Sequence, residues 1–437
     1  MKLTIEKVIY GGQGLARIPE TEGALSGKRI FVPFTLPGEQ VRASLVEDTR
    51  GYTVGQLQQI DAASPQRTQP ACPHFTHCGG CQLQHAAYAA QIDIKRGVLL
   101  ETLARAGLKD IPEISALHGT PLAYRNRMRL HLQTQPHFAI GYREQAAHTL
   151  VPIEQCPIVT PVLQQCLQAI RALGEEQHIP EGISEMELFT NHDGSAVVLS
   201  AFTTQQDHSL QQDSEAFFTS LAARVPELTG AALFLRQTGR NAKPEPQPLL
   251  RWKAQNLIYR VGAHSYQVSI GSFFQINQSM LGAFVALVTD GLHGKLAWDL
   301  YAGVGLFARV LAEKFQQVTA VEASATSSKD LQHNLHVLPA NVIHATTNEF
   351  LSATLEQRTV SPDLAVLDPP RAGLGMETAN LLARCRPQRI VYVSCDPATL
   401  SRDLKALTES GYRLHRLHMV DMFPQTYHQE TVAVLLR

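Results

Sequence analysis

Cys395 is the residue whose position most strongly suggests chemistry, in the stretch VYVSCDPATLSRDL. The apolar, β-branched run before it predicts a strand, and Asp396 and Pro397 predict the N-cap and first residue of a helix. A structural thiol is more often buried inside an element, and an inert buried cysteine is the alternative here. The helix dipole favours the thiolate, whereas the charge of Asp396 opposes it, so the direction of the pKa shift stays open. The position predicts a nucleophile at a strand end.

Two carboxylates are expected on the same edge of a sheet. Asp368 ends a strand in LAVLDPPRAGLG, and Glu430 begins one in HQETVAVL. Only PQTYHQ separates this last strand from the one before it, so the two must pair antiparallel. Ligands bind outside the carboxyl ends of parallel strands, and the last strand starts at that edge. We therefore expect Cys395, Asp368 and Glu430 to converge on one cleft.

A glycine-rich turn predicts a nucleotide-like cofactor. WDLYAGVGLFARVLA places Gly303, Gly305 and Ala308 in the G-x-G-x-x-G/A spacing, after a strand and at a helix start. Glu322 ends the next strand, nineteen positions after Gly303, where a carboxylate can accept both ribose hydroxyls. A dinucleotide dehydrogenase would carry a similar turn, and glycines that merely turn the chain are the structural alternative.

The chain divides into three predicted domains within an α/β fold. Residues 1–61 read as short strands broken by glycine, which predicts a five-stranded β-barrel of the oligonucleotide-binding type. Residues 62–265 mix helices and strands after a segment rich in proline, glycine, cysteine and histidine. Residues 266–437 alternate strand and helix, which predicts a doubly wound, mainly parallel sheet. Its seven strands and final hairpin resemble the Rossmann-like sheet of class I S-adenosylmethionine-dependent methyltransferases.

Bulk composition excludes few partners. The 437 residues carry a net charge of −1 and are 44% hydrophobic, so the chain is not coated in positive charge. A local basic patch remains possible: Arg125, Arg127 and Arg129 alternate, which on a strand puts them on one face. A solvated strand face explains that pattern equally well. No secretory signal or long apolar run is found, so we expect a cytoplasmic protein with no membrane partner and with reduced or metal-bound cysteines. We also expect a monomer.

Three cysteines lie close together near the start of the second domain. Cys72, Cys78 and Cys81 form C-x5-C-x2-C, and three thiols need a fourth ligand to close a metal site. The spacing does not distinguish a zinc site from an iron–sulfur cluster. Cys166 and Cys385 lie in helical stretches with apolar neighbours and are expected to be core thiols.

Five segments together resemble a known family. GSFFQINQ, DLYAGVGLF, VLDPPRAGLG, VYVSCDPATLSRDL and HQETVAVL occur in this order. They resemble the RNA 5-methyluridine methyltransferases of the iron–sulfur, uracil-C5 type, which act on ribosomal or transfer RNA. The likeness extends over nearly the whole chain: residues 1–61 look like a TRAM module, and LAYRNRMRLHL and IGYRE look like an RNA-facing central domain. We expect 23S rRNA as the substrate, with transfer RNA as the alternative.

The resemblance implies roles for individual residues. Cys395 would attack C6 of a uracil that has left its stack, and Glu430 would remove the C5 proton after methyl transfer. The residues assigned to the S-adenosylmethionine side of the site are Gln275, Tyr301, Gly303, Glu322 and Asp368. Those assigned to a [4Fe–4S] cluster are Cys72, Cys78, Cys81 and Cys156, the last in EQCPI, where proline follows the cysteine.

Some positions depart from the family pattern or stay open. Tyr301 and Ala302 occupy positions where members of the family often have phenylalanine and cysteine. Thr346 lies near the position where the family commonly has an Asp or Asn that contacts adenine. Phe273 and Phe274 would stack on a nucleobase or belong to the core.

Two other functions would fit parts of the sequence. Amino-group methylation of adenine uses Asp-Pro-Pro followed by an aromatic residue, where this chain has Arg371, and it does not need Cys395 and Glu430. A non-catalytic iron–sulfur RNA-binding or redox-sensing protein would not need Cys395, Glu430 and Asp368 together.

Overall fold

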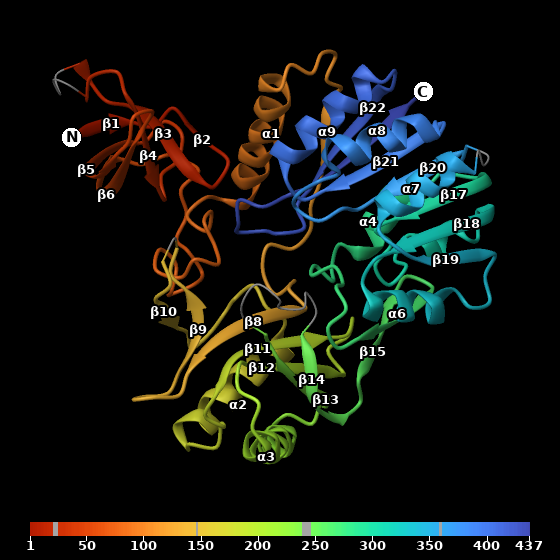
Figure 1. Ribbon diagram of the computed structural model, residues 1–437. Coiled ribbons are helices and arrows are strands. Elements are labelled where there is room, and N and C mark those ends of the chain that lie inside the picture. The colour runs from red at the N-terminus through yellow and green to blue at the C-terminus, as the bar shows by residue number, and fades with distance from the viewer. Residues whose placement is uncertain (21–24, 146, 238–245, 358–360) are drawn as a thin grey trace.

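The chain forms three units arranged around a central junction (Figure 1). The structure is a computed structural model that describes residues 1–20, 25–145, 147–237, 246–357 and 361–437. An N-terminal curled sheet and a C-terminal α/β unit lie side by side, and a central unit lies below them (Figure 1).

The N-terminal unit is a single six-stranded sheet in the order β1-β5-β6-β4-β3-β2. Its strands are β1 (Lys2–Thr4), β2 (Lys7–Val8), β3 (Gln13–Arg17), β4 (Arg29–Pro33), β5 (Gln40–Asp48) and β6 (Thr53–Ala62). Inward-facing apolar residues such as Ile30, Val32 and Val41 form its core. The prediction of five strands was one short, because the two-residue strand β2 is too brief to show a period-2 pattern.

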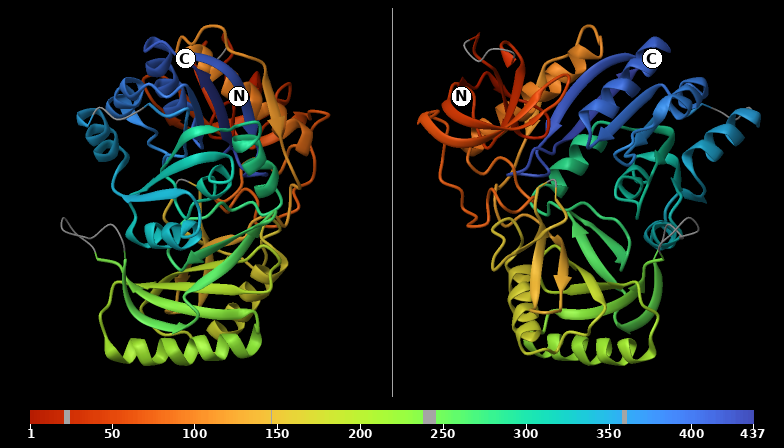
Figure 2. Two further views of the ribbon diagram at one scale, coloured as in Figure 1. Left: turned by 90° about the vertical axis from the view of Figure 1, so that its right-hand side faces the viewer. Right: turned by 60° about the vertical axis from the view of Figure 1, so that its left-hand side comes forward.

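The central unit is a seven-stranded sheet in the order β10-β9-β8-β11-β12-β13-β14. Its strands are β8 (Arg127–Gln133), β9 (Ala139–Arg143), β10 (Leu150–Pro152), β11 (Ile183–Thr190), β12 (Val197–Thr203), β13 (Leu228–Leu235) and β14 (Gln247–Lys253). The helices α2 (Pro161–Glu175) and α3 (His208–Arg224) cover its outer face (Figures 1 and 2). The hairpin of β15 (Asn256–Val261) and β16 (His264–Ser269) leads to the C-terminal unit.

The C-terminal unit is built on a sheet in the order β19-β18-β17-β20-β21-β23-β22-β7. Its strands are β17 (Gly294–Leu300), β18 (Phe315–Glu322), β19 (Ala340–His344), β20 (Leu364–Leu367), β21 (Arg389–Ser394), β22 (Arg413–Val420), β23 (Glu430–Leu436) and β7 (Ile114–Leu117). The five strands from β19 to β21 are parallel. As predicted, β23 pairs antiparallel with β22, and it also pairs antiparallel with β21.

Helices cover both faces of this sheet, so neighbouring strand residues belong to different cores. Val391 packs in the core with α4 (Leu281–Thr289), α5 (Ala308–Leu311) and α6 (Ala325–Leu335). Tyr392 packs in the opposite core with α1 (Tyr88–Arg105), α7 (Thr347–Glu356), α8 (Gly375–Cys385) and α9 (Pro397–Glu409). Burial on both faces explains the continuous apolar runs of these strands. No helix among the described residues is long and apolar enough to cross a membrane.

The predicted sheet of seven strands was also one short. The eighth strand, β7, pairs parallel with β22, and α1 packs against α9 and β22. Residues 88–117 therefore pack on the C-terminal sheet, although the sequence assigned them to the domain 62–265. In the sequence, the whole central unit separates these residues from the other strands of the sheet. No local sequence pattern therefore indicates that they join it.

A buried ion pair joins α1 to the segment that precedes β23. Lys95 Nζ lies 2.5 Å from Asp421 Oδ1, and at most 1% of either side chain is exposed. The same ammonium donates to the carbonyl of Phe423 at 3.0 Å. Gln91 and Gln425 exchange hydrogen bonds of 2.9 and 3.0 Å beside it. The first helix thus holds the segment that leads to Glu430.

Replacing Lys95 with alanine is expected to lower the free energy of unfolding by about 3–5 kcal/mol, because the Asp421 carboxylate would be left buried without its partner. Denaturant titration of the full chain measures the loss. The matched control is Arg96→Ala on the same helix, which breaks an exposed pair with Asp93 and should cost about 0–1 kcal/mol. Equal losses in both variants would contradict a special role for the buried pair.

Candidate active site

Cys395 lies between β21 and α9, as the sequence predicts. Pro397 is the first residue of α9, and Asp396 is its N-cap. Asp396 Oδ1 accepts hydrogen bonds from the backbone N–H groups of Ala398 and Thr399, each at 2.9 Å. The thiol is partly exposed rather than enclosed in the core. The predicted change from strand to helix at Cys395 is therefore confirmed.

Antiparallel pairing brings Glu430 next to Cys395. Ser394, the last residue of β21, pairs with Thr431 of β23, so the residues that flank this pair are neighbours. Asp368 directly follows β20, which is the other neighbour of β21. The charges of Glu430 and Asp368 both act on Cys395. The three predicted residues thus gather at one edge of the sheet.

The surroundings of Cys395 favour the neutral thiol. Its pKa is raised to about 12, and burial is the largest cause. The charge of Glu430 adds to the rise, and Asp368 and Asp396 act in the same direction. The Arg371 guanidinium lowers the pKa. Burial and the three carboxylates therefore raise the pKa of the thiol despite the opposing charge of Arg371.

Alkylation of Cys395 should therefore accelerate with pH. At pH 7 a thiol with this pKa is about 10⁻⁵ thiolate, and the fraction rises about tenfold per pH unit. We expect the rate with iodoacetamide to follow that slope from pH 7 to 10. Mass spectrometry of the peptide that carries Cys395 gives the rate. A plateau reached before pH 9 would show that the thiol is more acidic than its surroundings indicate.

Glu430 and Asp368 are two carboxyl groups that cannot both ionise easily. Glu430 is 3% exposed, and its Oε2 has no hydrogen-bond partner among the described residues. Burial raises the pKa of Glu430 well above its usual range, and the charge of Asp368 adds to this. Burial also raises the pKa of Asp368 to about 7, against a hydrogen bond of 3.2 Å from Gln275 Nε2. The pair is suited to hold and release a proton near neutral pH.

The glycine turn is tied to the end of the next strand. The N–H of Gly303 donates to Glu322 Oε2 at 2.8 Å, and the N–H of Ser324 donates to Oε1 at 2.7 Å. Tyr301, Gly303 and Gly305 all have positive φ, so the chain turns sharply away from β17. Each carboxylate oxygen of Glu322 keeps a lone pair for a further donor. The carboxylate therefore supports the turn and can still accept ribose hydroxyls.

Sequence reasoning missed Asp299 and undervalued Arg371. Asp299 is fully buried in β17; its Oδ2 accepts from the N–H of Ala308 at 2.8 Å, and its Oδ1 has no partner within the described part of the chain. Burial raises the pKa of Asp299 to about 8. Arg371 Nη2 lies 3.2 Å from His428 Nε2, and its charge lowers the pKa values of Cys395 and Glu430. A charged residue inside an apolar strand was the signal for Asp299.

Several candidates have structural roles instead. Thr346 caps α7 in a capping box with Glu349. Phe274 is 2% exposed, with its ring centroid 4.6 Å from that of Tyr259, so it belongs to the core. Phe273 is 62% exposed and remains available to a base.

Of the three alternating arginines, Arg127 and Arg129 lie on β8 and are paired with glutamates, whereas Arg125 precedes the strand. Arg127 pairs with Glu187 at 3.1 Å, and Arg129 pairs with Glu185 at 2.7 Å. Paired guanidiniums on a strand offer less charge to a phosphate backbone than the sequence pattern indicates.

The four cysteines Cys72, Cys78, Cys81 and Cys156 are neighbours in space. The charges of Cys72, Cys78 and Cys156 all raise the pKa of Cys81, although burial is the larger cause. Four thiolates are a donor set that soft metals prefer. In the described ranges, however, no three His, Cys, Asp or Glu side chains are arranged to hold a metal ion. The donor chemistry suits a cluster, and the side-chain geometry does not confirm one. Cys166 and Cys385 are buried core thiols, as predicted.

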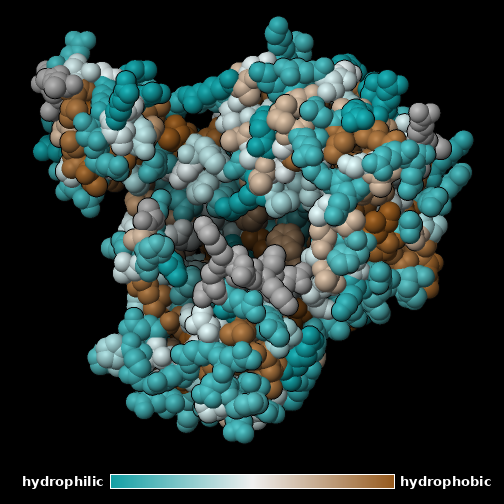
Figure 3. Space-filling view, viewed as in Figure 1, coloured by the Kyte–Doolittle hydropathy of each residue, from teal (hydrophilic) through white to brown (hydrophobic). Residues whose placement is uncertain are grey.

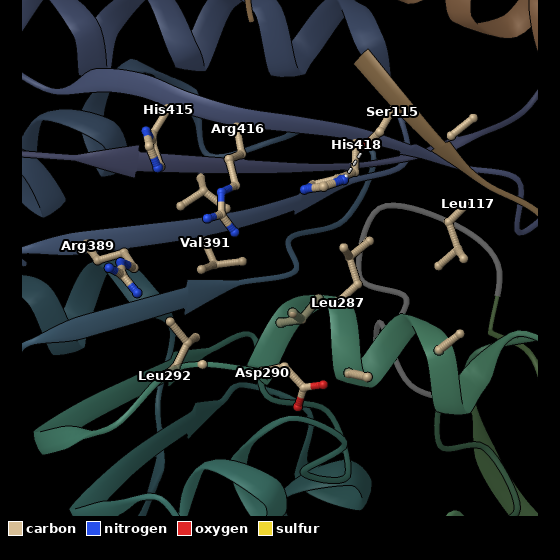
Figure 4. A pocket seen from close by; sticks show the side chains of 16 residues that line it. Ser115, Leu117, Leu287, Asp290, Leu292, Arg389, Val391, His415, Arg416 and His418 are labelled. Atoms are coloured by element: carbon tan, nitrogen blue, oxygen red, sulfur yellow. Dashed lines mark hydrogen bonds between the residues drawn. The ribbon is translucent and has the colours of Figure 1, made fainter. Parts of the chain in front are cut away.

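A hollow between the units and a groove beside the C-terminal sheet lie in different places on the described part of the molecule. The surface is hollowed where the three units meet (Figure 3). A separate groove of about 610 Å³ lies between α4 and the sheet, lined by Arg389, His415, Arg416 and His418 among others (Figure 4). None of the predicted site residues lines this groove. We therefore place the candidate site at the strand ends that carry Cys395, Glu430 and Asp368.

Comparisons with known proteins agree with this geometry. The family described as tRNA (uracil-5-)-methyltransferase matches residues 87–437. The 23S rRNA (uracil(1939)-C(5))-methyltransferase RlmD of Pectobacterium atrosepticum is 32% identical over 451 residues, covering 100% of this chain and 93% of that protein. An uncharacterized RNA methyltransferase of Aquifex aeolicus is also 32% identical, over 442 residues; the alignment covers 100% of this chain and 98% of that protein.

A solved structure shares the whole fold. The Pyrococcus abyssi tRNA (uracil-54, C5)-methyltransferase, in complex with S-adenosyl-L-homocysteine, aligns with a TM-score of 0.77 at 24% identity, covering 99% of each chain. The family match extends over most of the chain and the RlmD relative aligns with all of it. The chain therefore belongs to the tRNA (uracil-5-)-methyltransferase family and is an S-adenosylmethionine-dependent RNA uracil-C5 methyltransferase.

Proposed function

We propose that this enzyme methylates C5 of a uridine in 23S rRNA, with Cys395 as nucleophile and Glu430 as base. The proposal rests on the position of Cys395, Glu430 and Asp368, which lie together at the ends of neighbouring strands. The RlmD relative, which is named as a 23S rRNA enzyme and aligns with this whole chain, supports the choice of RNA. Ribosomal RNA as substrate also agrees with the expected cytoplasmic location. That the enzyme is a monomer stays a prediction.

The chemistry requires covalent help because C5 of uracil is a poor nucleophile. The partly exposed Cys395 thiol first loses its proton to water. Attack by the resulting thiolate forms an S–C6 bond and moves the C5–C6 π electrons into an enolate. S-adenosylmethionine supplies the methyl group that C5 then takes. Glu430 removes the C5 proton, the C5–C6 double bond re-forms, and the S–C6 bond breaks. A carboxylate whose pKa is raised by burial is a stronger base, as this proton transfer needs.

The residues of the cofactor side have matching chemistry. The turn at Gly303 lets a ligand approach the backbone, and Glu322 has lone pairs for ribose hydroxyls. Gln275 holds Asp368 by a hydrogen bond at the junction between the two substrates, and Tyr301 shapes the turn through its positive φ. We propose that these residues hold S-adenosylmethionine beside the target base, on which Phe273 stacks.

The choice between ribosomal and transfer RNA is testable directly. Unmodified 23S rRNA and unmodified tRNA transcripts would be incubated separately with the enzyme and radiolabelled methyl donor. We expect near-stoichiometric incorporation into 23S rRNA and background incorporation into tRNA. The tRNA enzyme that shares the fold is 24% identical, so its likeness concerns the fold alone. Stoichiometric labelling of tRNA would overturn the rRNA proposal.

We further propose that Cys72, Cys78, Cys81 and Cys156 hold a [4Fe–4S] cluster. Protein purified without oxygen should contain about four iron and four sulfide ions per chain and absorb as iron–sulfur proteins do. Cys156→Ser should lose most of this iron, whereas the core variant Cys166→Ser should keep it. Stoichiometric zinc without sulfide in the unaltered protein would contradict the cluster.

A further inference from the structure

A tyrosine of the N-terminal sheet reaches the residue next to the nucleophile. Tyr10, in the turn between β2 and β3, donates its hydroxyl to Asp396 Oδ2 at 2.8 Å. Its ring meets Tyr427 edge-on, with centroids 5.2 Å apart and planes at 88°. Burial and the charge of Asp396 raise the pKa of the Tyr10 phenol, so the hydroxyl remains a donor. The contact joins the two most distant units in sequence.

The two oxygens of Asp396 have different partners. Oδ1 caps α9 through two backbone N–H groups, whereas Oδ2 accepts from Tyr10. Among the described residues no other donor to Oδ2 is found. Tyr10 therefore completes the hydrogen bonding of a carboxylate that is adjacent to Cys395 in the chain and raises its pKa.

The turn around Tyr10 packs closely against Gln82 and Tyr427. A Cβ added at Gly12 would lie 2.8 Å from Gln82 Cβ and 3.5 Å from Tyr427 Cβ. The N–H of Gln82 donates to the carbonyl of Gln425 at 3.0 Å, which holds the segment before β23 against the same turn. Such close backbone packing defines one docked position of the turn.

A row of side chains continues from Tyr10 to Arg371. The ring of Tyr427 lies 4.0 Å from that of His428, and His428 Nε2 lies 3.2 Å from Arg371 Nη2. Arg371 is the cation that favours the Cys395 thiolate. Tyr10 thus contacts both Asp396 and the first member of the row that ends at Arg371.

We propose that Tyr10 is a positioning residue that completes the Cys395 site by orienting Asp396 and the Tyr427–His428–Arg371 row. The N-terminal sheet is then part of the catalytic unit and more than an RNA-binding attachment. The inference rests on the proposed role of Cys395.

Tyr10→Phe tests this, because it keeps the ring packing and removes the hydroxyl. The charged groups that face Cys395 are Asp396, Asp368 and Arg371 from the neighbouring loops and Glu430 from β23. Without the Tyr10 hydrogen bond, the charge of Asp396 is less dispersed, and we expect iodoacetamide to alkylate Cys395 about threefold more slowly at pH 8. Asp396→Asn keeps an N-cap but removes the charge, so it should alkylate faster than the unaltered protein.

Steady-state methylation provides the second readout. Tyr10→Phe should lower kcat about tenfold and leave KM for RNA within about twofold, as expected for misplaced reacting groups. The matched control is Tyr52→Phe, since Tyr52 packs on Phe31 within the same sheet. Unchanged alkylation and kcat in Tyr10→Phe, or a higher KM at unchanged kcat, would overturn the proposal. Alkylation needs neither RNA nor methyl donor, so failure of the proposed RNA function would be seen separately, as absent methylation in the unaltered protein.

Discussion

Replacing Cys395 with alanine is expected to lower the rate of RNA methylation at least about 10⁴-fold, because the proposed reaction begins with attack of the Cys395 thiolate on C6. With 5-fluorouridine in the RNA, the unaltered enzyme should form a covalent protein–RNA adduct, since the fluorine cannot leave as a proton. The variant should form none. Denaturing gel electrophoresis with labelled RNA detects the adduct.

The control for this variant is Cys385→Ala. Cys385 is a buried thiol at the end of α8, outside the strand edge, so its removal tests the loss of any one cysteine. It should keep methylation within a few-fold of the unaltered enzyme. Methylation by Cys395→Ala at the rate of Cys385→Ala would show that the reaction does not use the Cys395 thiol.

Replacing Glu430 with glutamine is expected to stop turnover after methyl transfer. Glutamine fills the same buried space but cannot take the C5 proton, so methylation should slow about 10²–10⁴-fold. The Cys395–RNA bond should then persist with natural uridine, and a methylated adduct should accumulate. Mass spectrometry of the nuclease-treated adduct should show one methyl group on the attached nucleotide.

Glu377→Gln serves as the control for Glu430→Gln. Glu377 is an exposed carboxylate in the first turn of α8, so its variant should turn over normally. Free methylated RNA as the product of Glu430→Gln at an unchanged rate would assign the proton to another base, with Asp368 as the neighbouring carboxyl group.

The strand-edge site was predictable because its signals are local. The N-cap at Asp396 and the first helical proline follow from residue types in a short stretch. The short connection before Glu430 forces antiparallel pairing, which sets Glu430 beside Cys395. The usual spacing also placed Glu322 at the end of the next strand, but its hydrogen bond from the N–H of Gly303 was not predicted.

The features that sequence reasoning missed depend on distant contacts. The eighth strand β7 and helix α1 precede the rest of the sheet by the whole central unit, and no periodicity records that they join it. The alternation of arginines did not show that β8 begins only at Arg127, nor that glutamates of β11 pair with Arg127 and Arg129. The pKa of Cys395 depends on carboxylates from three elements, so the helix start alone could not give its direction.

The central claim is tested most directly by identifying the methylated atom. Unmodified 23S rRNA would be treated with enzyme and methyl donor, digested to nucleosides and measured by mass spectrometry beside a reaction with Cys395→Ala. The account predicts 5-methyluridine, at most a few residues per RNA, from the unaltered enzyme and none from the variant. 6-Methyladenosine as the product, or 5-methyluridine formed equally by the variant, would contradict it.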